Sequence, residues 1–221
     1  IALEHMIPII LLTDSFISNG SEPWKIPSLD FITDIQTNHT TNPDNFSPFH
    51  HDEKTLARPW ALPGTPGLEH RIGGLEKSEN SGDVNYLPEN HERMTNLRQE
   101  KINILADSIP AIKVHGDDQG QLLVVGWGST YGAIRSAVNR AQSEGLSVSH
   151  VHLTYLNPFS KNLGDVIQKF EKILIPEMNM GQLLSIFRSK FLVDAKGLNK
   201  IQGKPFNIGE IFEKIKEMIK N

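Results

Sequence analysis

Cysteine is absent from the 221 residues of the chain. The chain therefore cannot form a disulfide, cannot bind a cysteine-ligated zinc ion or iron–sulfur cluster, and has no cysteine nucleophile. A protein without disulfides suits a reducing compartment, and we predict a cytoplasmic location.

Basic charge and long apolar runs are also scarce. The 22 Lys and Arg residues are outnumbered by 26 Asp and Glu residues, which gives a net charge of -4. Binding of a nucleic-acid backbone needs a basic surplus, so we expect no nucleic-acid partner. No apolar run approaches the roughly 20 residues that span a bilayer, and the first residues do not resemble a signal peptide, so we expect no membrane partner. The chain begins without methionine and enters an apolar run almost at once, which suggests that it is cut from something longer.

The apolar run is Pro-Ile-Ile-Leu-Leu-Thr at residues 8–13. It predicts a strand buried on both faces, of the kind found inside a parallel sheet. No alternation of strands and helices follows it directly, so we expect its sheet to lie upstream of this sequence.

Residues 18–106 are rich in proline, Asn, Asp, Ser and His. Proline restricts its own φ and the conformation of the residue before it, so long helices are not expected, except at residues 89–106. Scattered aromatic residues predict a segment draped over other protein rather than a disordered one. These are Trp24, Phe31, Phe46, Phe49 and Trp60.

Strands and helices alternate regularly after Lys113. Ile134, Ala137, Val138 and Ala141 form one apolar face of a helix that ends at Gly145. The alternation predicts an α/β fold with a mostly parallel sheet that has helices on both faces. We expect strands at residues 121–128, 148–155, 172–177 and 191–194, and further helices at residues 163–170, 180–189 and 208–219.

Residues 126–130, Gly-Trp-Gly-Ser-Thr, join a predicted strand to a predicted helix. Backbone N–H groups at a helix N-terminus can bind a phosphate or carboxylate, so Gly128, Ser129 and Thr130 are a candidate anion site. The alternative is a tight turn with a hydroxyl cap. Bound NAD is not expected, because Tyr131 stands where a dinucleotide fingerprint has its third glycine.

Histidine pairs occur at His50-His51 and at His150 and His152. The first pair precedes two acidic residues, but adjacent side chains of an extended chain point in opposite directions. The second pair shares one face of a predicted strand, which a helix normally covers, so we expect interior or edge histidines whose hydrogen bonds are satisfied. We therefore expect no metal site. Hydrolase chemistry is also unsupported, since no Gly-x-Ser-x-Gly motif is present.

Glycines and prolines give specific turns to residues 63–76, and His70 and Arg71 in this loop could reach an anionic ligand. Rigid, turn-rich loops of this kind often carry function. The alternative is a rigid crossover whose arginine pairs with a carboxylate of a neighbouring domain.

Several stretches together resemble the alpha-type subunit of 2-oxoacid:ferredoxin oxidoreductases, and they occur in the order found in that family. The Gly-Leu-Glu-His-Arg loop at residues 67–71 and Asn-Lys-Ile-Gln-Gly-Lys-Pro-Phe at residues 199–206 are most similar to the 2-oxoglutarate branch. The other stretches are residues 6–14, 19–24, 64–66, 74–76, 125–130, 152–158 and 175–183.

The resemblance implies three parts. Residues 1–20 would end a pyrimidine-type thiamine-diphosphate fold domain, residues 21–108 would be a proline-rich crossover, and residues 109–221 would be similar to the transketolase C-terminal domain. The complete complex would convert a 2-oxoacid and coenzyme A to an acyl-CoA, carbon dioxide and reduced ferredoxin. A beta-type partner subunit would hold most of the thiamine diphosphate site and a [4Fe–4S] cluster, and this chain would bind no cofactor itself.

The family's Tyr-Pro-x-Thr-Pro motif and the Thr-Arg element after it do not occur in the sequence. No catalytic residue is carried over, and we expect the chain alone to be inactive and to act as a scaffold and subunit-docking part. Two alternatives are an anion-binding regulatory module and the C-terminal domain of another thiamine-diphosphate enzyme, such as a transketolase.

Overall fold

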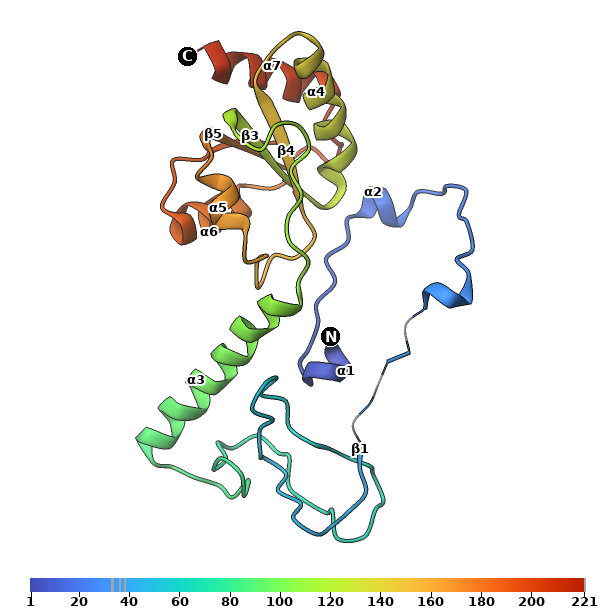
Figure 1. Cartoon of the computed structure of the whole chain (residues 1–221), viewed down its shortest axis with the longest axis vertical. Coiled ribbons are helices and arrows are strands. Elements are labelled where there is room, and N and C mark those ends of the chain that lie inside the picture. Colours follow the sequence, from blue (N-terminus) through green and yellow to red (C-terminus); the bar gives the residue numbers. More distant parts are fainter. Residues whose placement is uncertain (33, 36, 38, 221) are drawn as a thin grey trace. The chain divides into compact units, whose positions relative to one another are not determined.

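The computed structural model describes residues 1–220 apart from 33, 36 and 38 (Figure 1). The chain divides into two compact units. Ile1–Leu11 and Trp24–Ser108 form one, called the loop unit below. Leu12–Pro23 and Ile109–Asn221 form the other, called the sheet unit.

The sheet unit is built on a four-stranded parallel sheet with the order β4-β3-β5-β6. Leu123 of β3 lies opposite Ser149 of β4 and Ile173 of β5. The predicted α/β class and parallel sheet are therefore confirmed. The strands are β3 (Gly120–Trp127), β4 (Val148–Leu153), β5 (Phe170–Glu177) and β6 (Lys196–Asn199).

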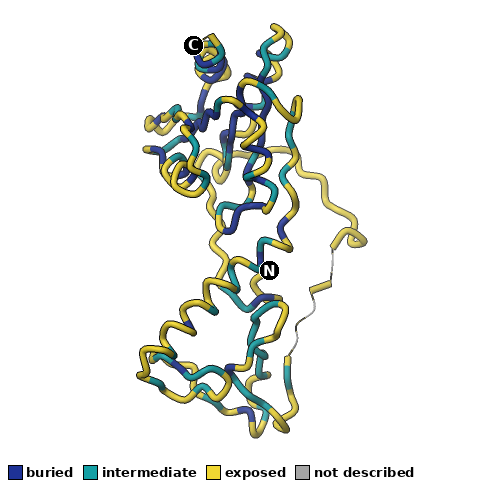
Figure 2. Tube along the Cα trace, turned by 60° about the vertical axis from the view of Figure 1, so that its left-hand side comes forward, coloured by how far each residue is buried: buried dark blue, intermediate teal, exposed yellow. Residues whose placement is uncertain are grey.

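Helices cover both faces of this sheet because successive strand residues point to opposite sides. Leu122 and Val124 of β3 pack toward α4 (Tyr131–Ser143) and α7 (Ile208–Lys220). Leu123 and Val125 pack toward α5 (Leu163–Ile167) and α6 (Gln182–Phe191). Figure 1 shows the two helix layers, and Figure 2 shows that the buried residues are concentrated in the strands between them.

Two predicted elements of the sheet unit were wrong in position. The helix expected at residues 163–170 ends at Ile167, because Phe170 already begins β5. No strand forms at residues 191–194, because α6 continues to Phe191, whose ring lies 4.8 Å from that of Phe187. The edge strand is β6 instead.

The buried strand predicted at residues 8–13 was expected to pair with a sheet upstream of this sequence, so it stays a prediction. These residues form no strand, and Ile10 and Leu11 are 82% and 83% exposed. A strand can be buried on both faces only inside a sheet, and no described strand pairs with this segment. Short helices flank it: α1 (Ala2–His5) and α2 (Ser15–Ser18).

The main element of the loop unit is α3 (Pro88–Leu105), which confirms the predicted helix. It begins with Pro88 in its first turn, where the missing N–H costs nothing. The short 3-10 segments η1 (Leu29–Phe31) and η2 (Ala106–Ser108) and the parallel pair β1 (His39–Thr40) and β2 (Trp60–Ala61) are the other elements beside α1.

Few apolar side chains are buried in the loop unit. Phe49 and Leu68 are buried between loops, and Met94 and Leu105 lie on the inner side of α3. Of the aromatic residues expected to anchor the segment, Trp24 and Phe31 are 78% and 84% exposed. These two rings are thus not buried by the described residues, and their packing on other protein stays a prediction.

None of the helices in the described part of the chain combines the length and the apolar character needed to cross a membrane.

Candidate functional site

The carboxyl ends of β3 and β5 form the first candidate site. The two strands are hydrogen-bonded neighbours, but the chain leaves β3 toward β4 on one side before it returns to β5 on the other. The strand order therefore reverses between β3 and β5. In open α/β sheets, ligands bind in the crevice at the carboxyl ends of strands where such a reversal occurs.

The turn after β3 requires glycine at two positions. A Cβ at Gly126 would lie only 2.5 Å from Cδ1 of Ile134, and Gly128 has a φ of +56°. Gly128, Ser129 and Thr130 form the 3-10 segment η3 that leads into α4. The hydroxyl of Thr130 donates to the carbonyl of Trp127 at 2.8 Å, so this hydroxyl shapes the turn.

A carboxylate of the chain itself lies at this turn. The hydroxyl of Ser129 donates to Oδ2 of Asp14 and also lies 3.6 Å from Sδ of Met178. Oδ1 of Asp14 accepts the N–H groups of Phe16 at 2.9 Å and Ile17 at 3.3 Å, which caps α2. A cavity of about 270 Å³ is lined by residues 12–14, 127–130 and 178–179. An external anion at Ser129 would have to displace the Asp14 carboxylate, and the anion site at Gly128, Ser129 and Thr130 stays a prediction.

Glu177 ends β5 beside this crevice and is completely buried. Its Oε2 accepts the N–H of Leu183 at 2.9 Å and the Nδ2–H of Asn179 at 3.0 Å, and its Oε1 accepts the N–H of Leu184 at 2.9 Å. The side-chain oxygen of Asn179 accepts the N–H of Gly181 at 2.7 Å. The carboxylate therefore satisfies orphan N–H groups of α6, where the helix dipole favours negative charge.

His150 and His152 lie on the face of β4 that α4 covers. The prediction that they are satisfied was wrong, because Nε2 of His150 and Nδ1 of His152 are buried and have no hydrogen-bond partner among the described residues. Their ring centroids are 5.9 Å apart, and Tyr131 packs on both. Burial, followed by the proximity of His152, Arg135 and His115, lowers the pKa of His150 to about 3. Both imidazoles are therefore suited to stay neutral at pH 7, since burial also lowers the pKa of His152.

Within the described residues, no group of three or more His, Cys, Asp or Glu side chains could hold a metal ion. The acidic residue after the His50-His51 pair has a local role instead. Oδ1 of Asp52 accepts the N–H groups of Lys54 at 3.0 Å and Thr55 at 2.8 Å. This segment is thus an ordinary turn, stabilised by its own aspartate.

The loop at residues 63–76 holds His70 and Arg71 differently. The ring of His70 packs edge-on against Phe46 at 5.3 Å, and its Nδ1 lies 2.8 Å from the carbonyl oxygen of Leu68. Arg71 is exposed and makes no hydrogen bond or ion pair with any residue that the structure describes. His70 therefore fixes the loop, whereas the guanidinium of Arg71 is available for binding.

The C-terminal end of this loop is fastened to α3. Glu76 accepts hydrogen bonds from Arg98 at 3.1 Å and from His91 at 2.8 Å. These hydrogen bonds lower the pKa of Glu76 to about 2. Lys77, only 3% exposed, donates to the carbonyls of Gly73 and Leu75 at 2.7 and 2.5 Å. The loop is thus held at defined points on a rigid helix.

The roles of Asp14 and Glu177 were missed in the sequence. Each carboxylate directly follows an apolar run and precedes the start of a helix, a position where Asp and Glu satisfy backbone N–H groups. That pattern could have identified Asp14. The six-residue separation between Glu177 and Leu183 is too long for the usual capping pattern.

Comparisons with known proteins agree on one family. Residues 121–211 match the pyruvate:ferredoxin oxidoreductase core domain II family. The 2-oxoglutarate oxidoreductase subunit KorA of Mycobacterium tuberculosis is 46% identical over 214 residues, which are 96% of this chain and 32% of that protein. The 2-oxoacid:ferredoxin oxidoreductase 1 subunit alpha of Aeropyrum pernix is 26% identical over 100% of this chain and 36% of its own length.

A solved structure is similar over both units' residues. It is the 2-oxoglutarate:ferredoxin oxidoreductase of Magnetococcus marinus with 2-oxoglutarate, coenzyme A and succinyl-CoA bound. It is 30% identical to this chain with a TM-score of 0.80, over 87% of this chain and 34% of that chain. The chain therefore spans about a third of the length of the relatives that it matches.

The parallel sheet and the matched residues define a part of a 2-oxoacid:ferredoxin oxidoreductase, and the chain belongs to that family. It is similar to alpha subunits of this family, among them a 2-oxoglutarate oxidoreductase subunit KorA, and it includes the core domain II region. The family that the sequence motifs predicted is thereby confirmed.

Proposed function

We propose that the chain is a scaffold and subunit-docking part of a 2-oxoglutarate:ferredoxin oxidoreductase. The complete complex would oxidise 2-oxoglutarate in the presence of coenzyme A to succinyl-CoA and carbon dioxide, with ferredoxin as the electron acceptor, in the cytoplasm. The observation that carries this proposal is the 46% identity to a KorA subunit over nearly the whole chain. The fold similarity to an enzyme solved with these reactants supports it.

The cofactors would be held mainly by a beta-type partner subunit. This chain has no cysteine, so its residues do not fit a [4Fe–4S] cluster. Its described residues contain no group of three or more His, Cys, Asp or Glu side chains that could hold a metal ion. The chain would therefore contribute structure and contacts to the complex rather than its redox groups.

Exposed apolar residues support a docking role. Ile10, Leu11, Trp24 and Phe31 are each at least 78% exposed. A partner that covers such side chains would remove their apolar surface from water. We propose that residues 1–20 complete a thiamine-diphosphate fold domain, that residues 21–108 cross over it, and that residues 109–221 form a transketolase-like C-terminal domain.

The first test is turnover. Full-length alpha subunit co-expressed with its beta-type partner should reduce viologen in a coenzyme-A-dependent reaction, with 2-oxoglutarate preferred over pyruvate and a branched 2-oxoacid. The 221-residue chain alone should bind no thiamine diphosphate and reduce no dye. A cofactor-loaded complex that is inactive with every 2-oxoacid would refute the activity, and turnover by the chain alone would refute the scaffold role.

We further propose that Arg71 contacts an anionic substrate or a carboxylate of a partner, with His70 holding its loop in place. A guanidinium presents several N–H donors in a planar fork, and none has an acceptor among the described residues. In the complete complex, Arg71→Ala should reduce kcat/KM or subunit affinity by about tenfold, the effect of losing one charged hydrogen-bonded contact.

Two controls sharpen this prediction. Arg71→Lys should reduce kcat/KM or subunit affinity less than Arg71→Ala does, because the positive charge remains while the planar fork of N–H donors is lost. Arg188→Ala removes an exposed arginine of the sheet unit that pairs with Asp194 at 3.2 Å, and it should change neither quantity. Wild-type kinetics and assembly in Arg71→Ala would contradict the assigned role.

A further inference from the structure

Three basic side chains of the loop unit interact electrostatically with one another. His51 and Arg58 come from the segment between Phe49 and β2, and Lys101 comes from α3. All three are partly buried. They are called the basic cluster below.

The cluster has more hydrogen-bond donors than acceptors. The ammonium of Lys101 donates to the carbonyl of Met6 at 3.1 Å, although an ammonium has three N–H groups to satisfy. The guanidinium carbon of Arg58 lies 4.4 Å from the ring centroid of Phe49, and no described residue accepts a hydrogen bond from this arginine. Partly buried donors without partners are uncommon in folded proteins.

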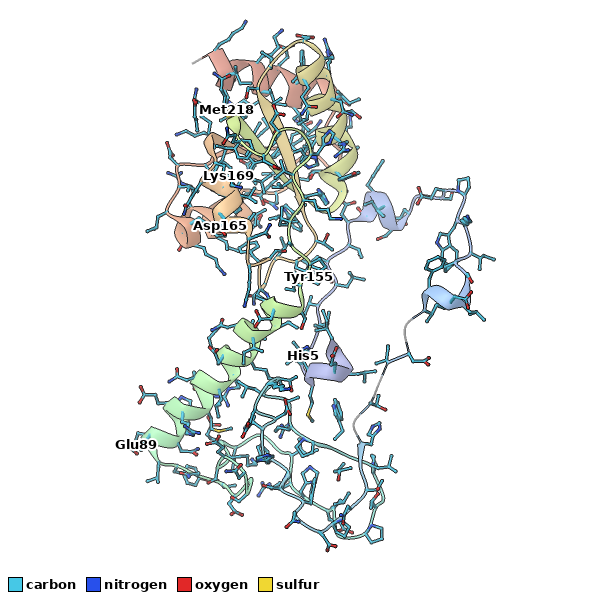
Figure 3. All side chains as sticks on the ribbon, in the orientation of Figure 1. His5, Glu89, Tyr155, Asp165, Lys169 and Met218 are labelled. Carbon is cyan, nitrogen blue, oxygen red and sulfur yellow. The ribbon has the colours of Figure 1, made fainter. Side chains whose placement is uncertain are left out.

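Two imidazole nitrogens in the loop unit are also without partners. Nδ1 of His51 and Nδ1 of His5 are buried and make no hydrogen bond. His5, labelled on α1 in Figure 3, is only 3% exposed and directly precedes Met6, whose carbonyl binds Lys101. One of these nitrogens therefore belongs to the cluster, and the other belongs to the residue before Met6.

The carboxylate that acts most strongly on His51 is already paired with another arginine. Glu79 acts on His51 electrostatically, but both of its oxygens are already bound by Arg93, with Nη2 at 2.9 Å from Oε1. Burial, followed by the charge of Arg58, lowers the pKa of Lys101 to about 8, and burial also lowers the pKa of Arg58 and of His51. Uncompensated charge in a partly buried place is costly, so an acceptor of opposite charge would be strongly favoured there.

The chemistry of the cluster restricts what it can bind. Cationic groups repel a metal ion, and the small number of them on a chain of net charge -4 does not make a nucleic-acid surface. A guanidinium fork beside an ammonium suits a compact oxyanion, which can accept several hydrogen bonds at once. We propose that the basic cluster of His51, Arg58 and Lys101 is a binding site for the carboxylate or phosphate group of a small molecule.

The site is separate in residues and chemistry from the crevice of the sheet unit and from Arg71. The test therefore measures binding without turnover, and it can fail independently of the oxidoreductase activity. The whole 221-residue chain would be titrated with inorganic phosphate and, separately, with succinate, at constant ionic strength. The imidazole resonances of His5 and His51 would be followed by NMR.

We expect saturable shifts of these resonances with at least one of the two anions. Lys101→Met and Arg58→Met should each weaken the binding by tenfold or more, because each keeps much of the side-chain volume and removes the charge. Lys54→Met is the matched control, since this exposed lysine belongs to the same segment and should leave the affinity unchanged. Tighter binding of phosphate or of succinate would identify which oxyanion the site prefers.

The amide resonances of α3 would verify that each variant remains folded. Neither methionine substitution breaks an ion pair with a carboxylate. The midpoint temperature of thermal unfolding should therefore rise or decrease only slightly. The proposal is overturned if neither anion gives saturable shifts, or if the folded Lys101→Met and Arg58→Met variants bind as tightly as the wild type.

Discussion

Glu177→Ala should destabilise the sheet unit by about 3 kcal/mol, because it leaves buried N–H groups without an acceptor. The carboxylate receives backbone bonds from Leu183 and Leu184, and a side-chain bond from Asn179. Its negative charge also faces the positive end of the α6 dipole, and this stabilisation is lost with the carboxylate. Urea denaturation followed through the amide resonances of β3 and β5 would measure the change.

Two further variants separate charge from hydrogen bonding. Glu177→Gln keeps one acceptor oxygen but turns an N–H₂ group toward a backbone donor, so we expect an intermediate loss of about 2 kcal/mol. Glu171→Ala removes an exposed carboxylate from the same strand and should change stability by less than about 0.5 kcal/mol. Equal stability of Glu177→Ala and Glu171→Ala would show that the buried carboxylate contributes nothing.

Acidification from pH 7 to pH 5 should destabilise the sheet unit by about 2 kcal/mol through His150. Burial holds the pKa of His150 at about 3 in the folded chain, whereas the unfolded imidazole has a pKa near 6.5. The unfolded state therefore binds more protons below pH 6.5, and stability falls as the pH drops from 6.5 toward 3. His152 contributes with the same sign, because burial lowers its pKa too.

Hydrogen exchange of the β3 and β4 amides at the two pH values would measure this loss. In His150→Phe the side chain cannot titrate, so most of the pH dependence of these amides should disappear. His39→Gln changes an exposed histidine of the loop unit and should leave that dependence intact. If hydrogen exchange in His150→Phe depended on pH as it does in the wild type, His150 would not be the source of the loss of stability at low pH.

The parallel sheet could be predicted because its signals are local. Leu122 to Val125 form a continuous apolar run, and Ile134, Ala137, Val138 and Ala141 repeat at helical spacing, so strand and helix are defined by their own residues. Phe191 was misassigned because its apolar character suits a strand and a helix equally. Phe191 packs against Phe187, which lies one helical turn earlier, and this contact favours the helix.

The polar contacts of the candidate sites depended on partners distant in the sequence. Ser129 was recognised as a helix-terminal hydroxyl, but nothing near it indicated that Asp14, 115 positions earlier, would accept its hydrogen bond. Arg58 and Lys101 likewise belong to separate segments. Their shared environment becomes visible only when α3 is placed beside the loop that carries Arg58. The burial predicted for residues 8–13 depends on neighbouring strands of a sheet that the described residues do not contain.

The sheet unit is assembled from two stretches of chain, residues 12–23 and residues 109–221. Residues 24–108 are therefore inserted in the sequence between the two stretches of the sheet unit. The entropy lost by closing a flexible loop grows only with the logarithm of its length, by about 0.6 kcal/mol for each doubling. Lengthening or shortening this insertion by a few residues should hence barely alter the stability of the sheet unit. The length of the loop unit can therefore change in evolution while the sheet stays the same.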